Sequence, residues 1–83
     1  MYYLYILRCA DDSLYTGITT DLVRRVEEHN KSALGAKYTR ARRPVTLVYS
    51  KKFRTRVTAS RAEYKTKQLT REQKIALIER ANR

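Results

Sequence analysis

The stretch SLYTGITTDLVRRVEEH, residues 13–29, changes from strand-like to helical spacing in its middle. Its first half contains the short β-prone run LYTGI, which predicts a strand. Its second half, from Thr20 or Asp21 onward, carries one stripe of residues at helical intervals: Leu22, Val26 and His29. An acid lies in the expected first turn, where the helix dipole favours negative charge. We therefore expect a strand followed directly by a helix, which ends near residues 30–32.

The run YYLYIL, residues 2–7, precedes this stretch and has β-prone residues at both its odd and its even positions. Such a run is typical of a strand that is covered on both faces. The residues CADDS then break the run and supply turn formers. The two β-prone runs therefore predict an antiparallel hairpin.

The length of the hairpin loop decides which face each tyrosine occupies. A two-residue loop at residues 11–12 would turn Tyr15 to the face opposite that of Tyr5. The two tyrosines share a face only if the loop has an odd number of residues or contains a bulge. We predict a three-residue loop at residues 11–13.

The rest of the chain is expected to form a basic loop, a third strand and two helices. SALGAKYTRARRP has no apolar period and contains Gly35 and Pro44, so it predicts an irregular loop of a length that is usually functional. VTLVYSKKF predicts a strand, and TASRAEYKTKQL and TREQKIALIERA predict helices, the second with a capping box of Thr70 and Gln73. The order ββαβαα predicts one domain over residues 1–83 of the mixed α/β (α+β) class, a three-stranded antiparallel sheet flanked by helices.

The chain carries a formal net charge of +11 and has no carboxylate between Glu28 and Glu63. Charge of one sign over such an interval attracts polyanions, and phosphate backbones come first among them. The alternative is that basic residues only keep the domain soluble, although solubility favours mixed signs. A membrane-surface role requires a basic amphipathic helix with apolar anchors, and the densest basic run, YTRARRP, is turn-like. We expect a nucleic-acid partner and no membrane.

The single cysteine, Cys9, cannot form an internal disulfide and lies in an apolar run, where a buried thiol is expected. This usage fits a reducing compartment. The apolar run at the N-terminus stops at Arg8 and has no positive region before it, so it is too short for a signal peptide or a membrane span. We expect a cytoplasmic protein.

The predicted helix and the strand before it offer candidate functional residues. Arg25 and His29 are four residues apart and project from one side of the helix, whereas Arg24 points roughly 100° away into solvent. Gly17 lies within a predicted strand, where a glycine usually marks a bulge or the close approach of a ligand to the backbone. A purely structural role for Gly17 is as well supported as a functional one. The bias toward tyrosine, with seven Tyr against one Phe, suits base stacking or proton handling, although any single Tyr usually belongs to the core.

Glu63 is the first acid after the acid-free interval. It would pair with Lys67 one turn later, or close a capping box with Ser60. The functional alternative is a lone carboxylate that holds one hydrated divalent cation against a phosphate. One His and one Cys exclude a zinc site, and the chain has neither a Gly-rich phosphate loop nor a Ser/His/Asp set.

Together these segments resemble the GIY-YIG nucleases, and more closely the small stand-alone bacterial members of that superfamily. YLY at residues 3–5 and YTG at residues 15–17 stand where the two motifs fall. DLVRRVEEH is similar to the helix that carries the family's arginine and often a histidine, and GAKYTRARRP is similar to the basic loop of the stand-alone group. The resemblance covers essentially the whole chain. Many members place an asparagine where this chain has Ile75, and Asn30 is the candidate to replace it.

The resemblance implies paired tyrosines Tyr5 and Tyr15, Gly17 as the small residue beside them, Arg25 as the phosphate-binding cation, His29 as an auxiliary group and Glu63 as the metal ligand. It implies hydrolysis of a phosphodiester with one Mg²⁺ or Mn²⁺ ion, in which Tyr5 activates or positions the attacking water. The residues of the basic loop that we expect to bind nucleic acid are Lys37, Tyr38, Arg40, Arg42 and Arg43.

The first hypothesis is therefore a divalent-metal-dependent DNA endonuclease that acts in repair or recombination. We expect it to be structure-selective or nonspecific, because no recognition domain is visible in this sequence. We expect DNA rather than RNA, and a protein partner that selects the substrate is compatible with this hypothesis. The alternative is a non-catalytic nucleic-acid binding module with the same fold. A structural interaction protein is the third hypothesis, and it leaves the basic interval unexplained.

Overall fold

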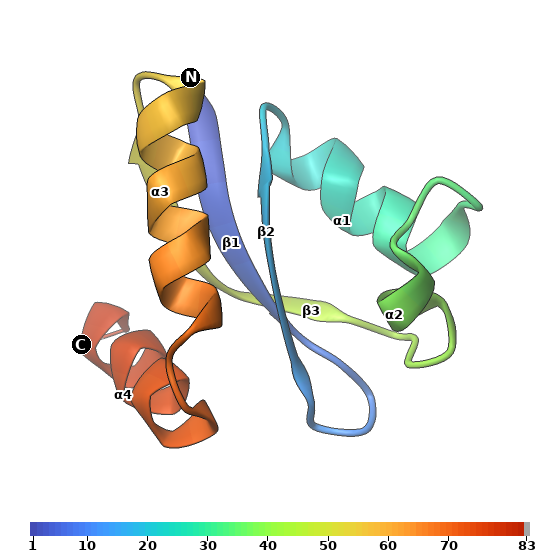
Figure 1. The fold of residues 1–83 in the computed structure, drawn as a ribbon. Coiled ribbons are helices and arrows are strands. Elements are labelled where there is room, and N and C mark those ends of the chain that lie inside the picture. The colour runs from blue at the N-terminus through green and yellow to red at the C-terminus, as the bar shows by residue number, and fades with distance from the viewer. Residues whose placement is uncertain (83) are drawn as a thin grey trace.

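The computed structural model of the chain describes residues 1–82. Its elements in chain order are β1 (Tyr2–Arg8), β2 (Leu14–Thr19), α1 (Leu22–Lys31), α2 (Lys37–Arg40), β3 (Thr46–Phe53), α3 (Arg56–Lys67) and α4 (Arg71–Ala81). The strands form one antiparallel sheet in the order β2-β1-β3. Helices α1 and α2 lie on one face of this sheet, and α3 and α4 lie on the other (Figure 1). The expected fold class is confirmed.

The central strand β1 is buried on both faces, as its sequence predicts. Alternate residues of a strand point to opposite faces, so Leu4 and Ile6 lie toward the face that α3 covers. Tyr5 and Leu7 lie toward the opposite face, where the apolar stripe of α1 packs against them. The two helical layers therefore meet the same strand from both sides.

The β1–β2 hairpin has a three-residue loop at residues 10–12, one position earlier than predicted. The N–H of Cys9 donates to the carbonyl of Ser13 at 2.8 Å, and the N–H of Asp12 donates to the carbonyl of Cys9 at 2.9 Å. Asp12 has a φ of 70°, and such a left-handed residue after a tight turn is the usual way to close a three-residue hairpin. The loop length is odd, so Tyr5 and Tyr15 share a face, and that expectation is confirmed.

Helix α1 begins at Leu22, one or two residues later than the start at Thr20 or Asp21 that its sequence pattern indicated. Asp21 is the N-cap and accepts the N–H of Arg24 at 3.1 Å, so its carboxylate satisfies a free N–H group from just outside the first turn. The stripe of Leu22 and Val26 packs on the face of the sheet that carries Tyr5. Arg25 and His29 follow from the same helix, on the side that meets the sheet.

The basic segment at residues 32–44 contains the short helix α2, and its description as wholly irregular is wrong. The carbonyl of Ala36 accepts the N–H groups of Thr39 and Arg40, which closes the turn without an apolar period in the sequence. Helix α3 lies two residues earlier at each end than the predicted segment 58–69, because Thr55 is its N-cap and accepts the N–H of Thr58. Helix α4 begins as predicted, with the capping box of Thr70 and Gln73. Among residues 1–82, no helix is both long and apolar enough to cross a membrane.

Candidate active site

The ring of Tyr5 fills the space in which any residue other than glycine would place its side chain at position 17. The two residues are register partners on β1 and β2. A Cβ added to Gly17 would overlap the phenol oxygen and lie 2.6 Å from Cζ of Tyr5. The ring of Tyr5 therefore extends across β2, the edge strand of the sheet, and the close approach that a strand glycine predicts is made by a side chain of the same domain.

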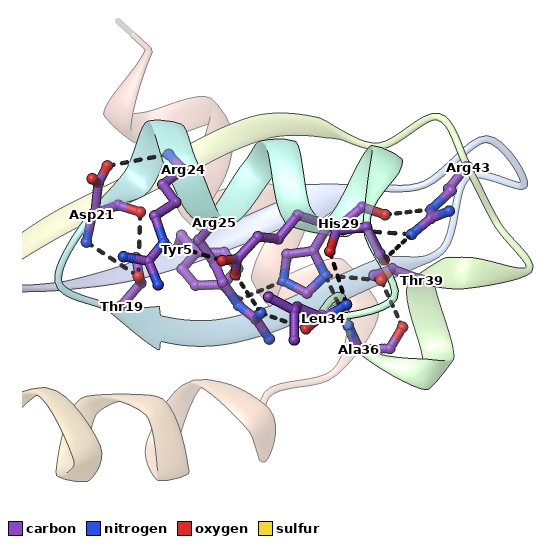
Figure 2. A network of polar contacts seen from close by, with 12 residues as sticks. Tyr5, Thr19, Asp21, Arg24, Arg25, His29, Leu34, Ala36, Thr39 and Arg43 are labelled. Carbon is purple, nitrogen blue, oxygen red and sulfur yellow. Dashed lines mark hydrogen bonds and ion pairs between the residues drawn. The ribbon is translucent and has the colours of Figure 1, made fainter.

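The Tyr5 hydroxyl ends a buried chain of hydrogen bonds that runs to α1 and α2. Its oxygen lies 2.9 Å from Nε2 of His29, and Nδ1 of His29 lies 2.8 Å from the hydroxyl oxygen of Thr39 (Figure 2). The Thr39 hydroxyl donates to the carbonyl of Ala36 at 2.9 Å, so its oxygen accepts the Nδ1–H of His29. We assign this tautomer from the two short bonds. The Ala36 N–H, which points at Nδ1 from 3.4 Å, then has no acceptor there. Nε2 then accepts the proton of Tyr5.

Both members of this pair are uncharged at neutral pH. Burial lowers the pKa of His29 to about 4, and the nearby Arg25 cation acts in the same direction. Burial also raises the pKa of the Tyr5 phenol; Arg25 opposes that rise, and the negative charge of Glu63 adds to it. At rest the proton lies on Tyr5, and the neutral imidazole beside it is able to accept that proton.

Arg25 leaves α1 on the inner side, as the helical spacing predicts. Its side chain is 26 % exposed, whereas that of Arg24 is 75 % exposed. Nη1 of Arg25 donates to Glu28 at 2.9 Å and to the carbonyl of Leu34 at 2.8 Å. Both short bonds use Nη1, so the donors on Nε and Nη2 are not used by these two partners. Arg25 also lowers the pKa of the Tyr5 phenol. Arg24 shares Glu28 but points away from the sheet.

Tyr15 is surrounded by aromatic rings. Its ring centroid lies 6.4 Å from that of Tyr5, 5.2 Å from that of His29 and 5.9 Å from that of Tyr38. Tyr38 stacks on Tyr15, and the Arg42 guanidinium lies 3.9 Å from the centroid of the Tyr38 ring. The basic segment is therefore attached to the paired tyrosines through Tyr38.

The cations of the basic segment differ in what they contact. Arg43 donates to the carbonyls of His29 and Ser32, each at 2.6 Å, at the C-terminal end of α1. Arg42 pairs with Asp11 at 3.0 Å and donates to the Tyr38 carbonyl at 2.8 Å. Lys37 and Arg40 are exposed.

Thr39 is the member of the network that the sequence did not indicate. It is fully buried and bonded to His29, yet a threonine in a basic segment without periodicity carries no signal of such a role. Asn30, the candidate to replace the family's asparagine, bonds both backbone groups of Val45 and so joins α1 to the start of β3. Ile75 lines an apolar cavity between α4 and the sheet.

Glu63 lies on α3 with a side chain that is 24 % exposed. Its carboxylate pairs with Lys67 at 3.4 Å, which is the ion pair expected from the sequence. The alternative capping box with Ser60 does not form, because α3 begins a turn earlier with Thr55 as its N-cap. The negative charge of Glu63 is the smallest of the causes that act on the pKa of Tyr5, and it raises that pKa. Among residues 1–82, no three His, Cys, Asp or Glu side chains come together.

Known proteins resemble this chain over nearly its full length. Residues 1–76 match the family model of the GIY-YIG catalytic domain. A UPF0213 protein of Desulfotalea psychrophila is 54% identical over 77 residues, which cover 93% of this chain and 70% of that protein. A UPF0213 protein of Halobacterium salinarum is 52% identical over 78 residues, which cover 94% of this chain and 100% of that protein.

Solved structures agree with these relatives. The solution NMR structure of the UPF0213 protein of Bacillus halodurans has a TM-score of 0.61 at 48% identity and covers 95% of this chain and 84% of its own. A solution NMR structure of an E. faecalis protein has a TM-score of 0.64 at 40% identity and covers 99% of this chain and 88% of its own. With its hairpin, its arginine-bearing helix and these relatives, the chain belongs to the GIY-YIG family, among the small UPF0213 proteins.

Proposed function

We propose that this protein is a divalent-metal-dependent endonuclease that hydrolyses phosphodiester bonds of DNA. The observation that carries the proposal is the Tyr5 phenol, which is hydrogen-bonded to a neutral buried histidine beside Arg25. A binding module gains nothing from a buried proton donor and acceptor next to a phosphate-binding cation. The residues of the proposed site are Tyr5, Tyr15, Gly17, Arg25, His29 and Glu63.

Arg25 is the proposed binding group for the scissile phosphate. Its guanidinium is held at Nη1 by Glu28 and by the Leu34 carbonyl, so the remaining donors are fixed in direction. A planar fork of this kind matches two phosphate oxygens and costs little reorganisation when charge develops on a pentavalent phosphate. This residue therefore stabilises the transition state more than the ground state.

Tyr5 positions the attacking water. Its O–H donates to His29, so the lone pairs of its oxygen accept a hydrogen bond from a water molecule. As the water oxygen bonds to phosphorus, the water proton moves to the Tyr5 oxygen, and the Tyr5 proton moves to Nε2 of His29. The bond from phosphorus to the leaving oxygen breaks, and that oxygen takes a proton from solvent. Burial disfavours the imidazolium that His29 has become, so His29 releases its proton to solvent and the neutral pair is restored. Thr39 keeps the imidazole in the tautomer that this transfer requires.

Glu63 is the residue that would hold the metal ion. Mg²⁺ keeps several waters and takes one or two protein carboxylates together with phosphate oxygens, so a lone carboxylate near the site suits it better than a closed cage would. An ion held by Glu63 would supply positive charge that offsets the charge developing on the leaving oxygen. To bind the ion, Glu63 would give up its ion pair with Lys67. That pair is partly exposed, so its loss would cost little stability.

The proposed substrate is DNA, which the single domain would cut either according to its structure or without selectivity. We propose that it acts in the cytoplasm, in DNA repair or recombination. Lys37 and Arg40 are the exposed cations of the basic segment and the proposed contacts to the backbone. Tyr38 holds that segment against Tyr15, and Arg42 supports Tyr38. Arg43 holds the segment against the end of α1. A further protein would supply any finer selection of substrate.

The test is cleavage of labelled duplex, single-strand, flap and four-way-junction DNA with Mg²⁺ or Mn²⁺. We expect Glu63→Gln and Arg25→Ala each to reduce the rate by about 10²-fold or more, the usual cost of losing one group that stabilises the transition state. Glu27→Gln is the matched control, because Glu27 also pairs with a lysine one turn later. Arg24→Ala is the second, because Arg24 shares Glu28 with Arg25. Both controls should cut normally.

Binding of Mn²⁺, measured by electron paramagnetic resonance in the presence of DNA, separates the two functions. The endonuclease should lose the ion in Glu63→Gln and retain it in Glu27→Gln. If the wild-type protein binds the DNA panel, cuts none of it and binds DNA equally well as Glu63→Gln, the endonuclease proposal is wrong and the non-catalytic binding module is right.

A further inference from the structure

The outer face of α3 carries a shallow hollow of about 510 Å³. Its lining comes from one helix and consists of Arg56, Val57, Ser60, Arg61, Tyr64 and Lys65. Tyr64 is 67% exposed and Val57 is 59% exposed, so an aromatic ring and an apolar side chain stand in solvent two turns apart. At a rise of 1.5 Å per residue this separation is about 10 Å along the helix.

The charge of this hollow is of one sign. Arg56, Arg61 and Lys65 line it, and no carboxylate does. The single acid of α3 is Glu63, whose ion-pair partner is Lys67. Exposed cations around an exposed aromatic ring form the combination that binds single-stranded nucleic acid, because cations hold the phosphates and the ring stacks on a base.

The hollow lies next to the side of α3 that carries Glu63. Ser60 lines it, and on a helix Ser60 neighbours both Glu63 at i+3 and Tyr64 at i+4. Arg56 also lines a second, smaller hollow of about 130 Å³, whose other walls include Ile18 and Thr19 at the end of β2. The basic face of α3 therefore extends to the strand that the Tyr5 ring crosses.

We propose that the outer face of α3 binds an unpaired strand of the substrate, with a base stacked on Tyr64 and its phosphates bound by Arg61 and Lys65. A tyrosine ring stacks only on a base whose face is free, and bases inside a duplex have both faces covered. If the protein is the proposed endonuclease, this binding site should make it prefer to cleave beside single-stranded segments. That consequence rests on the proposed function. The binding site itself is testable without cleavage.

The first test is equilibrium binding of a fluorescein-labelled oligothymidylate, measured by anisotropy in EDTA so that no cleavage occurs. We expect Tyr64→Ala to weaken binding about 5- to 150-fold, the range for loss of one stacked base, and Tyr64→Phe to bind like wild type because it keeps the ring. The control is Val23→Ala, which removes an equally exposed apolar side chain from α1. Binding of a blunt duplex of the same length should be unchanged in all three variants.

The second test removes charge. The double variant Arg61→Gln, Lys65→Gln should lower the slope of log affinity against log salt by about 1.4 for the single strand, since each phosphate contact contributes about 0.7. The control is Arg71→Gln, Lys74→Gln, which removes the same charge from α4. An equal fall in slope for both double variants would mean that only the net charge matters, and it would overturn the site.

The outcomes separate this inference from the proposed function. If wild type cuts DNA while Tyr64→Ala binds oligothymidylate normally, the inference is wrong and the endonuclease stands. If Tyr64→Ala loses single-strand binding and no variant cuts, the inference stands and the endonuclease is wrong. If wild type dimerises in light scattering and Tyr64→Ala does not, while single-strand binding is unaffected, the face binds a second copy of the chain and the inference is wrong.

Discussion

Tyr5 shows how a single residue connects the core to the candidate chemistry. Tyr5 is 2% exposed, so it is a core residue by burial, yet its hydroxyl reaches His29 on α1. The glycine opposite it on β2 makes this possible, because any Cβ there would overlap the phenol. The small residue of the second motif therefore leaves the space that the Tyr5 ring fills.

We expect Gly17→Ala to displace the Tyr5 ring and break its bond to His29. Tyr5 has no solvent to move into, so the overpacking should cost about 1–3 kcal/mol of stability and at least about 10²-fold in cleavage. Urea denaturation and the cleavage assay measure the two effects. Thr19→Ala, two residues along the same strand, is the control. Normal cleavage by Gly17→Ala would contradict the proposed role of Tyr5.

Protonation of His29 should destabilise the fold in acid. Its folded pKa is about 4, below the unfolded value near 6.5, so the unfolded chain binds the proton more readily below pH 6.5. Stability is therefore lost as the pH falls from about 6.5 through about 4, with a slope of roughly 1 kcal/mol per pH unit near pH 5. Urea midpoints across this range measure it. His29→Gln should be less stable at pH 7 but should lack this part of the slope; an unchanged slope would mean that His29 is not a buried neutral base.

At the scale of elements, the segment between α1 and β3 combines two tasks. Arg43 caps the carbonyls at the end of α1, where a cation also suits the helix dipole, and Arg42 covers Tyr38. Gly35 allows close packing, because a Cβ there would lie 2.6 Å from the carbonyl oxygen of Glu28. The segment is thus held at its ends, while Lys37 and Arg40 remain exposed.

We expect Arg43→Ala and Arg40→Ala to differ in what they damage. Arg43→Ala leaves carbonyls of α1 without their charged donor and should lower stability by about 1.5–3 kcal/mol. Arg40→Ala should leave the melting temperature unchanged and weaken DNA binding, because its side chain is exposed. Thermal melting and anisotropy measure these properties. A stable Arg43→Ala variant with a selective loss of DNA affinity would show that Arg43 is itself a phosphate contact.

At the scale of the whole molecule, the proposed site lies where two layers meet at one edge of the sheet. Arg25 and His29 come from the helical layer on one face, and Glu63 comes from the layer on the other face (Figure 1). The edge strand β2 lies between them. The proposed phosphate contacts Lys37, Arg40, Arg61, Lys65 and Arg25 come from both layers, so nucleic acid would be bound across that edge.

The affinity for single-stranded DNA should depend steeply on salt. Five phosphate contacts at about 0.7 each predict a slope near −3.5, which is about a hundredfold loss of affinity between 50 and 200 mM salt. Anisotropy across this range measures the slope, and circular dichroism at both ends checks that the fold is unchanged. A slope shallower than −1 would contradict an electrostatic interface of this size.

The strands and the long helices could be predicted because they depend on local patterns. YYLYIL is apolar on both parities and is buried on both faces, and the Leu22–Val26 stripe faces the sheet. The short helix α2 could not be predicted, because its turn is closed by the Ala36 carbonyl and carries no apolar period. Thr39 was missed for the same reason, since its role depends on where that turn places it relative to α1.

The sequence by itself determined the fold class, the basic character and the side of α1 on which Arg25 and His29 lie, because periodicity and charge are properties of neighbouring residues. Only the tertiary structure decided that the Tyr5 ring fills the place of a Gly17 side chain and bonds His29. That contact depends on strand register, and a shift of one residue would move every side chain of a strand to the other face. The register follows from the loop at residues 10–12 and the packing of α1, which join residues that local patterns do not connect.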